Sequence, residues 1–378
     1  MATINTDKIA QDAIDAIAER INNLNRLNII VAGKTGVGKS TLINAVFRDK
    51  LAQTGLGKPV TNHMRKITKK DLPISIYDTR GFELGKDTQA QVKRKILETI
   101  HNGLASKDIN ETIHCIWYCI NTASNRVEPE EIQWIKELSR DNQITQVPII
   151  IVLTQSFSKK NAQTLRQMLL NENLDVVQVV PVLAVDYEID DEYVLKAYGL
   201  DALIHIMGEA LPEELLETLK NVQIASLEEK KRLAQAAVAT ATVAAASEGA
   251  VPIPFSDCAL LIPTQLTMIA AITVAFGFDL NKSILVGFIS STLGTGGATI
   301  LGRTVVSNLI KMIPGIGPIA GGAISAGAAG IITAALGEAY IGILTMVFNG
   351  EMSIDDLSSK KGRDEMNKLF QEELSKKR

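Results

Sequence analysis

Residues 33–40 have the types and the spacing needed to bind a phosphate group. A glycine, four further residues and then Gly-Lys-Ser follow an apolar run (27–32) and precede a helical pattern (41–48). In such a loop, glycine-rich backbone lets successive N–H groups converge on a phosphate at the start of a helix. Lys39 would neutralise β- and γ-phosphate oxygens, and Ser40 would ligate Mg²⁺. The residues predicted to contact the nucleotide here are Gly33, Lys34, Thr35, Gly36, Val37, Gly38, Lys39, Ser40 and Thr41.

A second signal lies in residues 74–81, where a strand-like run ends at Asp78 and Gly81 follows three residues later. A carboxylate at a strand tip can hold Mg²⁺ through water, and Gly81 would let a backbone N–H approach the γ-phosphate. Thr61 lies between the two motifs, where a hydroxyl and its own amide can sense the third phosphate. We therefore predict a metal site at Ser40, Thr61 and Asp78. The residues predicted to act in catalysis are Lys39, Thr61 and Gly81.

Strand and helix patterns alternate after these motifs. The predicted elements are strands at 112–121, 148–154 and 176–185, and helices at 129–140 and 161–170. Such alternation predicts a mostly parallel sheet with helices on both faces and the nucleotide at the carboxyl ends of the strands. Cys115 and Cys119 fall on one face of the first of these strands and His114 on the other. This placement favours core positions over a metal or catalytic site.

The two motifs resemble those of the translation-factor-related GTPases, the class that includes Ras-like and Era-like proteins, and the resemblance covers residues 25–212. It implies a Ras-like α/β fold, binding of GTP and GDP with Mg²⁺, and an enzyme that hydrolyses GTP to GDP and phosphate. One departure is Phe82, which stands where a catalytic glutamine usually follows the glycine. The substitution implies slow intrinsic hydrolysis. Help would come from a partner, from self-association or from a nearby group; the candidate groups are Arg80, Lys34 and Arg126.

A further departure concerns the base. The family's Asn/Thr-Lys-x-Asp motif is represented here by Thr154-Gln155-Ser156-Phe157, so a phenyl ring replaces the aspartate that accepts guanine N–H groups. The short Ser-Ala-like turn of the family appears only as residues 183–185. Thr154 and Gln155 remain the candidate base-side residues. Guanine is expected from the overall resemblance, and these residues do not show how it would be chosen over adenine.

The composition excludes several classes of protein. The chain has 378 residues and a formal net charge of -3, which gives no basic footprint, so no nucleic-acid partner is expected. Its three cysteines form no Cys-x-x-Cys pair, so neither a disulfide framework nor a zinc site is indicated. The first residues lack the apolar core of a signal peptide. A cytoplasmic protein is expected, with association to the inner face of a membrane as an option.

Residues 233–350 are rich in Ala, Gly, Ile and Thr and almost free of charge. Three uncharged runs, at 258–278, 283–302 and 312–337, are each long enough to span a bilayer as a helix. The third run carries small residues at every fourth position, which let helices approach closely. Membrane association is slightly favoured over a tightly packed soluble helical hairpin. Asp257 and Gln265 are expected to cap helices or bond between them, with an ion pathway as the alternative.

The two ends of the chain carry amphipathic patterns. Ile14, Ile17, Ile21 and Leu24 form the apolar stripe of an N-terminal helix, which would pack in place or dock on the C-terminal half or a second subunit. The C-terminal tail has balanced charges and a thin apolar stripe, and it is predicted to be a solvent-exposed helix. Residues 376–378 are basic and could contact anionic lipid.

A second resemblance concerns the helical part. Residues 250–257 and 263–269 look like the helical domain of unknown function that follows Era-like GTPase domains in many bacterial proteins, and the two-part architecture is similar to that of immunity-related GTPases. The predicted domains are an amphipathic helix (1–26), a GTPase domain (27–212), a charged helical linker (213–232), an all-α, apolar, Gly/Ala-rich domain (233–350) and a charged helix or tail (351–378).

The functional prediction is a Mg²⁺-dependent GTP switch that controls the helical domain. One alternative is a membrane or scaffold protein whose nucleotide domain binds but barely hydrolyses, and another is a nucleotide-gated, pore-like effector. The expected partners are guanine nucleotide, membrane lipid, and either a second copy of the chain or an activating protein.

Overall fold

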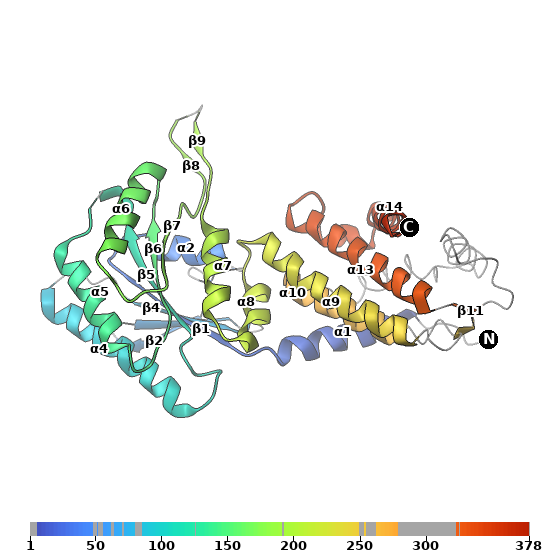
Figure 1. The fold of residues 1–378 in the computed structure, drawn as a ribbon, viewed down its shortest axis with the longest axis horizontal. Coiled ribbons are helices and arrows are strands. Elements are labelled where there is room, and N and C mark those ends of the chain that lie inside the picture. The colour runs from blue at the N-terminus through green and yellow to red at the C-terminus, as the bar shows by residue number, and fades with distance from the viewer. Residues whose placement is uncertain are drawn as a thin grey trace. The chain divides into compact units, whose positions relative to one another are not determined.

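The computed structural model describes most of the chain. The described residues are 6–47, 51, 56–61, 64–69, 72–79, 85–124, 126–190, 193–248, 253–254, 262–278, 323–324 and 326–377. They form two compact units (Figure 1). The sheet unit comprises Leu24–Ser226, and the helical unit comprises Met1–Asn23 together with Leu227–Arg378.

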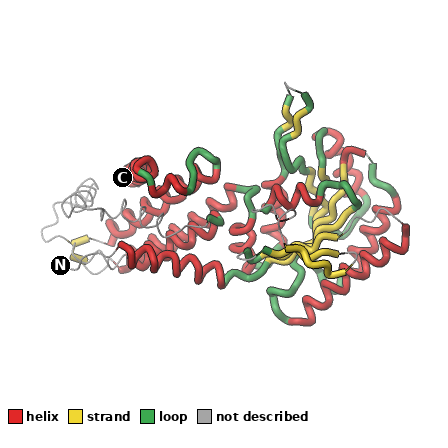
Figure 2. The backbone as a smooth tube through the Cα atoms, turned by 180° about the vertical axis from the view of Figure 1, so that it is seen from behind, coloured by secondary structure: helices red, strands yellow, loops and turns green. Residues whose placement is uncertain are grey.

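A seven-stranded sheet forms the centre of the sheet unit (Figure 2). Its strands are β1 (Leu27–Gly33), β2 (Leu56–Thr61), β3 (Met64–Thr68), β4 (Ile74–Thr79), β5 (Cys115–Asn121), β6 (Ile149–Thr154) and β7 (Gln178–Pro181). Their spatial order is β2-β3-β4-β1-β5-β6-β7. The strands from β4 to β7 are parallel, whereas β3 runs antiparallel to both β2 and β4. This mostly parallel sheet confirms the predicted Ras-like α/β fold.

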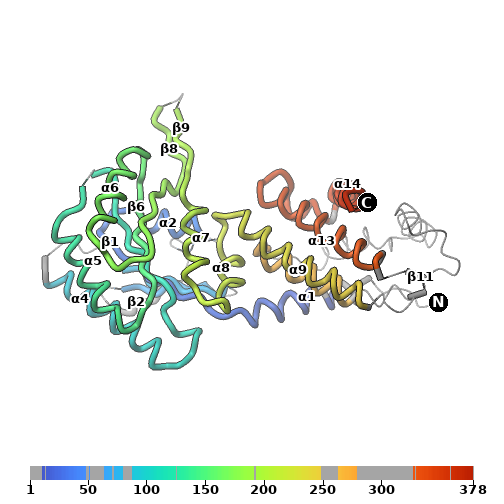
Figure 3. Tube along the Cα trace, viewed as in Figure 1, coloured from blue at the N-terminus to red at the C-terminus, as the bar shows by residue number. Residues whose placement is uncertain are grey.

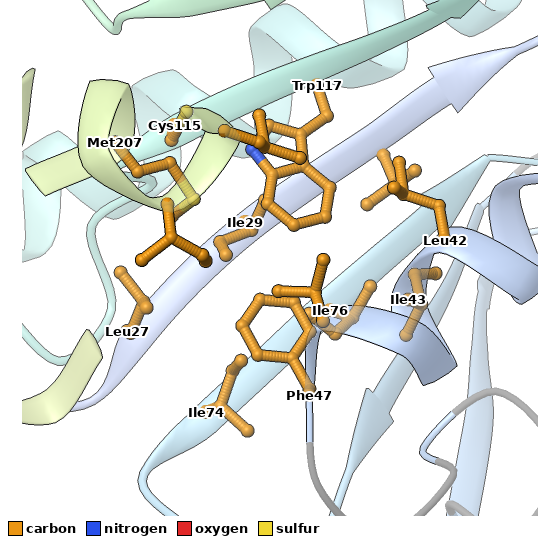
Figure 4. Packing of buried hydrophobic residues seen from close by; sticks show 14 of the residues in the cluster. Leu27, Ile29, Leu42, Ile43, Phe47, Ile74, Ile76, Cys115, Trp117 and Met207 are labelled. Carbon is orange, nitrogen blue, oxygen red and sulfur yellow. The ribbon is translucent and has the colours of Figure 1, made fainter. Parts of the chain in front are cut away.

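Helices cover both faces of the sheet, because its central strands are apolar on both sides. One face packs against α2 (Lys39–Val46), α7 (Leu200–Ala210) and α8 (Leu216–Val222), and the other packs against α4 (Gly85–Ser106), α5 (Pro129–Asp141) and α6 (Lys159–Asn171). On the first face, the rings of Phe47 and Trp117 stack with centroids 5.5 Å apart (Figure 4). Cys115 and Cys119 belong to this same cluster, as predicted.

Two of the predicted strands are shorter in the structure. β5 begins at Cys115 rather than at 112, because the Asn28 side chain donates 2.8 Å hydrogen bonds to the carbonyls of Asn110 and Thr112 and holds that segment in a turn. β7 ends at Pro181, since the chain then forms an antiparallel bridge between Leu183 and Tyr198. The residues enclosed by this bridge include a small hairpin of β8 (Tyr187–Glu188) and β9 (Val194–Leu195).

Residues 213–226, which the sequence places in a linker, pack within the sheet unit. They form a 3-10 turn (Glu213–Leu215) followed by α8, and Leu215, Leu219 and Val222 are fully buried beneath the sheet. Thr218 Oγ1 donates a 2.7 Å hydrogen bond to the carbonyl of Asn25. The compact units therefore meet in the sequence at Ser226 and Leu227.

The helical unit contains α1 (Thr6–Asn22), α9 (Leu227–Glu248), α10 (Ile262–Phe276), α13 (Ala326–Phe348) and α14 (Lys360–Lys376), and a short strand pair, β10 (Ile253–Pro254) with β11 (Ala323–Ile324). α9 packs against both α10 and α13, and α1 packs against α10 (Figure 3). A Cβ added at Gly337 of α13 would lie 2.5 Å from Val238 of α9, so the absence of a side chain allows this close approach. Gln265 donates a 3.3 Å hydrogen bond to Thr333, which confirms its predicted role between helices.

The C-terminal helix is more buried than predicted. Met366 and Leu374 of α14 are almost completely buried, and the Leu369 side chain packs where Gly342 of α13 leaves room. The expectation of a solvent-exposed helix is wrong for the apolar side of α14, because this side packs against α13. The charged side of α14 is exposed.

The structure describes the three uncharged runs of spanning length only in part. α10 has 15 residues, fewer than the about 20 of a bilayer span, but residues 258–261 lie outside the described part of the chain, so the prediction for 258–278 stays a prediction. Within the described ranges, one stretch, Ala329–Phe348, is long and apolar enough to cross a membrane by length and composition. The run 283–302 and Asp257 lie outside the described residues, as does the first part of 312–337.

Candidate nucleotide site

The phosphate loop connects β1 to α2 through a turn that needs glycine. Gly36 and Gly38 have φ values of 75° and 91°, in the left-handed region that side chains disfavour. At Gly33 (φ 142°), a Cβ would lie 2.5 Å from the Cys119 carbonyl oxygen of the neighbouring strand. Gly38 is also the N-cap of α2 and gives that helix no side-chain cap. The first turn of α2 thus has N–H groups available for an anion.

The side chain of Lys39 folds back onto the phosphate loop. Its Nζ donates hydrogen bonds to the carbonyls of Gly33 at 2.9 Å and Lys34 at 3.0 Å, and the residue is only 9% exposed. The ammonium group is therefore held inside the curve of the loop. Ser40 and Thr41, the next two predicted contacts, are exposed at the start of α2. The phosphate-binding residues predicted from the sequence lie together on this single turn.

Asp78 lies beside the phosphate loop at the carboxyl end of β4, paired with Val31 of β1. Its Oδ1 is buried and has no hydrogen-bond partner among the residues that the structure describes. Burial raises the pKa of Asp78 above its usual value, and the positive charges of Lys39 and Arg65 act in the opposite direction. An orphaned, buried carboxylate oxygen next to a phosphate loop fits a Mg²⁺ ion with its water shell.

The described residues contain no cluster of three or more His, Cys, Asp or Glu that could hold a metal by itself. A hydrated Mg²⁺ ion requires no such cluster, because waters and nucleotide phosphates fill most of its coordination sphere. Thr61 lies in β2, but its side chain is outside the described residues. Arg80, Gly81 and Phe82 are also outside them, so the predictions for these positions stay predictions.

Thr154 and Gln155, at the end of β6, contact the phosphate loop directly. The Thr154 hydroxyl lies within hydrogen-bond distance of the Val37 carbonyl, and Gln155 Nε2 donates a 2.9 Å bond to the Gly36 carbonyl. Gln155 has a φ of 52°, which is uncommon for a residue with a side chain. The structure therefore brings the predicted base-side residues and the predicted phosphate-side residues into one site.

The segment after Gln155 is fixed to the chain that follows β7. The Ser156 N–H donates to the Val182 carbonyl at 3.1 Å, and the Tyr198 hydroxyl donates to the Ser156 carbonyl at 2.8 Å. Phe157, at the position of the missing aspartate, packs its ring against Tyr187 of the β8–β9 hairpin with centroids 4.4 Å apart. No pattern in the sequence pointed to this aromatic pair, because the two residues are thirty positions apart in a segment without a motif.

Lys34 and Arg126, two of the candidate catalytic cations, each pair with a carboxylate. Lys34 Nζ lies 2.7 Å from Oε2 of Glu131, a buried residue of α5 whose Oε1 accepts a 3.1 Å hydrogen bond from the Tyr118 hydroxyl. Arg126 is 77% exposed and pairs with Glu128 at 3.0 Å. Glu131 was not identified from the sequence, where it is one of three glutamates in four residues at the start of a helix.

His114, which precedes β5, and the two cysteines of β5 are buried core residues, as predicted. His114 Nδ1 accepts a 3.0 Å hydrogen bond from the Asn28 N–H, and burial lowers the pKa of His114 to about 4. Burial raises the pKa of both Cys115 and Cys119 to about 12, so neither thiol ionises at neutral pH. The fold uses these side chains for packing.

Comparisons with known proteins match the part of the chain that contains the phosphate loop. Residues 28–155 match the family model described as 50S ribosome-binding GTPase. Septin-9 of Rattus norvegicus is 26% identical over 146 residues, which cover 32% of this chain and 26% of the septin. Cell division control protein 10 of Candida albicans is 26% identical over 199 residues, 44% of this chain and 55% of that protein. Translocase of chloroplast 90 of Arabidopsis thaliana is 34% identical over 101 residues, 25% of this chain and 13% of that protein.

Two solved structures are also similar. Cdc11 from Saccharomyces cerevisiae covers 51% of this chain and 95% of its own at 15% identity and a TM-score of 0.31. A dimerization-deficient mutant of Toc33 from Arabidopsis thaliana covers 56% and 93% at 17% identity and a TM-score of 0.32. Both scores are too low to add to the fold described above.

The matched family model, the sheet topology and the phosphate loop together define a P-loop GTPase domain. This domain is related in sequence to septins and to translocase of chloroplast 90. The chain spans about half or less of these curated relatives, so the relationship concerns the GTPase domain and not the whole of those proteins.

Proposed function

We propose that this protein is a GTP-hydrolysing switch whose nucleotide state controls its helical unit. The proposal rests on two groups of one site: Lys39, held inside the phosphate loop, and the carboxylate oxygen of Asp78, which has no hydrogen-bond partner among the described residues. The first offers a positive charge to β- and γ-phosphate oxygens, and the second offers an acceptor to a hydrated Mg²⁺ ion. Ser40 and Thr61 complete the proposed metal site.

In this proposal the residues of the chain position the nucleotide and stabilise charge. Ser40, Thr61 and Asp78 would hold the Mg²⁺ ion, which would supply positive charge to offset the negative charge that develops on the phosphates during transfer. Lys39 gives up its two carbonyl bonds to reach the phosphates, and the Gly81 amide approaches the γ-phosphate. Phe82 supplies no group to orient water, so hydrolysis is slow for the isolated chain. Self-association or an activating protein would raise the rate.

Binding is tested by isothermal calorimetry of the full chain with GTP, GDP and ATP, each with Mg²⁺. We expect GTP and GDP to bind, and Lys39→Ala to abolish or strongly reduce that binding. The matched control is Lys136→Ala, which removes a lysine from the surface of the same unit, where it pairs with Glu172. Equal affinity of the Lys39→Ala variant and the control for GTP would contradict the proposed site.

Hydrolysis is tested by multiple-turnover phosphate release at increasing protein concentration. A specific rate that rises with concentration would support activation by self-association. A low rate that stays constant would favour an external activating protein. The absence of any turnover above the Lys39→Ala background would favour the alternative, a scaffold that binds nucleotide and barely hydrolyses it.

Control of the helical unit is tested by hydrogen exchange. If the nucleotide state controls the helical unit, we expect different exchange in α9, α10 and α13 with GTP and with GDP. Lys39→Ala should remove the difference. Identical exchange in both nucleotide states would contradict the switch while leaving nucleotide binding intact.

Membrane attachment is a second candidate function, and Ala329–Phe348 is the observation that favours it. We propose a cytoplasmic protein that associates with the inner face of a membrane through its helical unit. Sedimentation with liposomes containing anionic lipid tests this proposal, and protease protection of residues 258–337 separates a spanning or pore-like state from peripheral binding. Failure of the full chain to sediment with liposomes in either nucleotide state would contradict it.

A further inference from the structure

The base side of the nucleotide site has an aromatic pair where its relatives' motif has a carboxylate. Phe157 and Tyr187 lie with ring centroids 4.4 Å apart and planes inclined by 52°. Phe157 is half-buried, whereas Tyr187 is 47% exposed. A tilted pair of this kind leaves aromatic surface available on the exposed partner. Any role of this surface toward a base rests on the nucleotide binding proposed above.

The pair is held close to the phosphate loop by short connections. Gln155 bonds to Gly36, and Phe157 follows only two residues later, a reach of about 7 Å at most. On the other side, the Tyr198 hydroxyl bonds to Ser156, and the Lys159 ammonium lies 4.9 Å from the centre of the Tyr198 ring. The base of the β8–β9 hairpin is therefore anchored to the segment that follows β6.

Two acidic residues of the hairpin, Asp186 and Asp190, are hydrogen-bonded within the hairpin, whereas Glu188 of β8 is exposed. Asp186 Oδ1 accepts a 2.8 Å hydrogen bond from the Ala197 N–H, and its Oδ2 pairs with Lys196 at 2.8 Å. Asp190 Oδ1 accepts a 2.8 Å bond from the Tyr193 N–H. Residues 154–160 contain no aspartate or glutamate. The segment that follows β6 thus brings no carboxylate to accept the N–H groups of guanine.

We propose that Phe157 and Tyr187 form the base-side wall of the site and hold the purine ring by packing, without reading its exocyclic 2-amino group. Aromatic rings stack on any base, because every base has a π-face. A carboxylate would instead discriminate, since an analogue without the amino group leaves one of its oxygens unpaired. The site therefore takes GTP and its 2-deamino analogue ITP with similar affinity.

The test is calorimetric titration of the full chain with GTP and with ITP, both with Mg²⁺. We expect the two dissociation constants to agree within about threefold, because the segment that follows β6 offers the 2-amino group no carboxylate. Tyr187→Ala should weaken the binding of both nucleotides by the same factor, about 5- to 150-fold, the range that corresponds to loss of one stacking contact. Tyr193→Ala is the matched control, because it removes an exposed tyrosine from the same hairpin and should change neither constant.

The Phe157→Asp variant should bind GTP in preference to ITP. The new carboxylate stands at the motif position and should make GTP bind about tenfold or more tightly than ITP, since charge-assisted hydrogen bonds are worth more than neutral ones. Because this variant changes a half-buried ring, its fold is checked by tryptophan fluorescence, and Tyr187→Ala keeps the test valid if it does not fold.

Two results would overturn the inference while leaving the proposed function intact. One is GTP binding about tenfold or more tightly than ITP in the unmodified chain, which would reveal a polar reader of the 2-amino group. The other is Tyr187→Ala with unchanged affinity for both nucleotides, which would show that the aromatic pair only anchors the hairpin. Failure of the unmodified chain to bind either nucleotide would overturn both the inference and the proposed function.

Discussion

Lys34 of the phosphate loop forms a 2.7 Å ion pair with Glu131 of α5, and the Glu131 side chain is only 6% exposed. Tyr118 of β5 donates its hydroxyl to the other oxygen of the same carboxylate. One buried carboxylate thus joins the phosphate loop, a central strand and a covering helix. Removing a partner from such a group leaves the others unpaired in a place that water reaches poorly.

Glu131→Ala should lower the free energy of unfolding of the sheet unit by about 2 kcal/mol, because Lys34 and Tyr118 both lose their acceptor. Both tryptophans of the chain, Trp117 and Trp134, lie in this unit, so urea unfolding followed by tryptophan fluorescence measures it selectively. The control is Glu128→Ala, which breaks the exposed pair with Arg126 and should cost less than about 0.5 kcal/mol. Equal losses in the two variants would contradict the role given to Glu131.

Asp78→Asn should raise the stability of the protein and weaken its nucleotide binding. Burial disfavours the Asp78 carboxylate in the nucleotide-free protein, so the neutral amide should raise the free energy of unfolding. The same change should weaken Mg²⁺-dependent GTP binding by about 10- to 100-fold, the usual effect of losing a partner of the metal's water shell. Urea unfolding and calorimetry with and without Mg²⁺ measure the two effects. A variant that loses stability and keeps its Mg²⁺ dependence would contradict this assignment of Asp78.

Gly33→Ala should lower the free energy of unfolding more than Gly36→Ala, although both glycines lie in the phosphate loop. The added methyl group at Gly33 would meet the Cys119 carbonyl oxygen of β5, whereas no heavy atom of the described residues lies within 4 Å of a Cβ at Gly36. We expect Gly33→Ala to cost about 2–4 kcal/mol and Gly36→Ala about 1 kcal/mol, the latter from its positive φ alone. Thermal unfolding followed by tryptophan fluorescence compares them. The reverse order would show that the loop relaxes around Gly33.

His114 should make the sheet unit less stable in acid. Its pKa is about 4 in the folded protein and about 6.5 in an unfolded chain, so the unfolded state takes up a proton first as the pH falls. Stability is therefore complete above about pH 6.5 and is lost between pH 6.5 and 4, by about 3 kcal/mol from this residue. His114→Asn keeps an acceptor for the Asn28 N–H and should flatten this part of the urea-derived profile. His205→Asn, an exposed substitution on α7, is the control, and a slope unchanged by His114→Asn would contradict the prediction.

Gly337→Ala should lower the stability of the helical unit. A methyl group there would approach Val238 of α9 at 2.5 Å and Met268 of α10 at 2.8 Å, so we expect a cost of about 1–3 kcal/mol from overpacking. Gly327→Ala, in the same helix, adds a methyl group that meets no described atom within 4 Å, so it should be neutral or stabilise by up to about 1 kcal/mol. Hydrogen exchange of α9 and α13 amides measures both variants. Faster exchange in the Gly327 variant than in the Gly337 variant would contradict the packing described.

The sequence predicted the parts of the site that depend on local backbone. The phosphate loop needs glycine where the backbone is left-handed, and it needs a lysine directly after its last glycine. Gly36, Gly38 and Lys39 were therefore identified from the spacing of the motif. Asp78 followed from its place at a strand end. The parallel sheet followed from alternating strand and helix patterns, because both of its faces must be covered.

Contacts between distant segments could not be predicted in this way. Glu131 meets Lys34 because α5 covers the sheet beside β1, and nothing in its own neighbours marks it as a partner. The Phe157–Tyr187 pair depends on where the chain turns after β7. The burial of Leu374 in α14 depends on the small residues of α13, which determine how closely the two helices approach. Each of these is a property of the assembled fold rather than of a short segment.

The packing of α1 against α10 has a consequence for biosynthesis. α1 ends at Asn22, and α10 begins at Ile262, roughly 240 residues later; at ribosomal speeds of about 5–20 residues per second this gap lasts about 12–48 seconds. During that time the whole sheet unit emerges and can fold, while the apolar stripe of α1 waits without its partner. α1 is thus synthesised early, and its packing against α10 forms only after the sheet unit has been made.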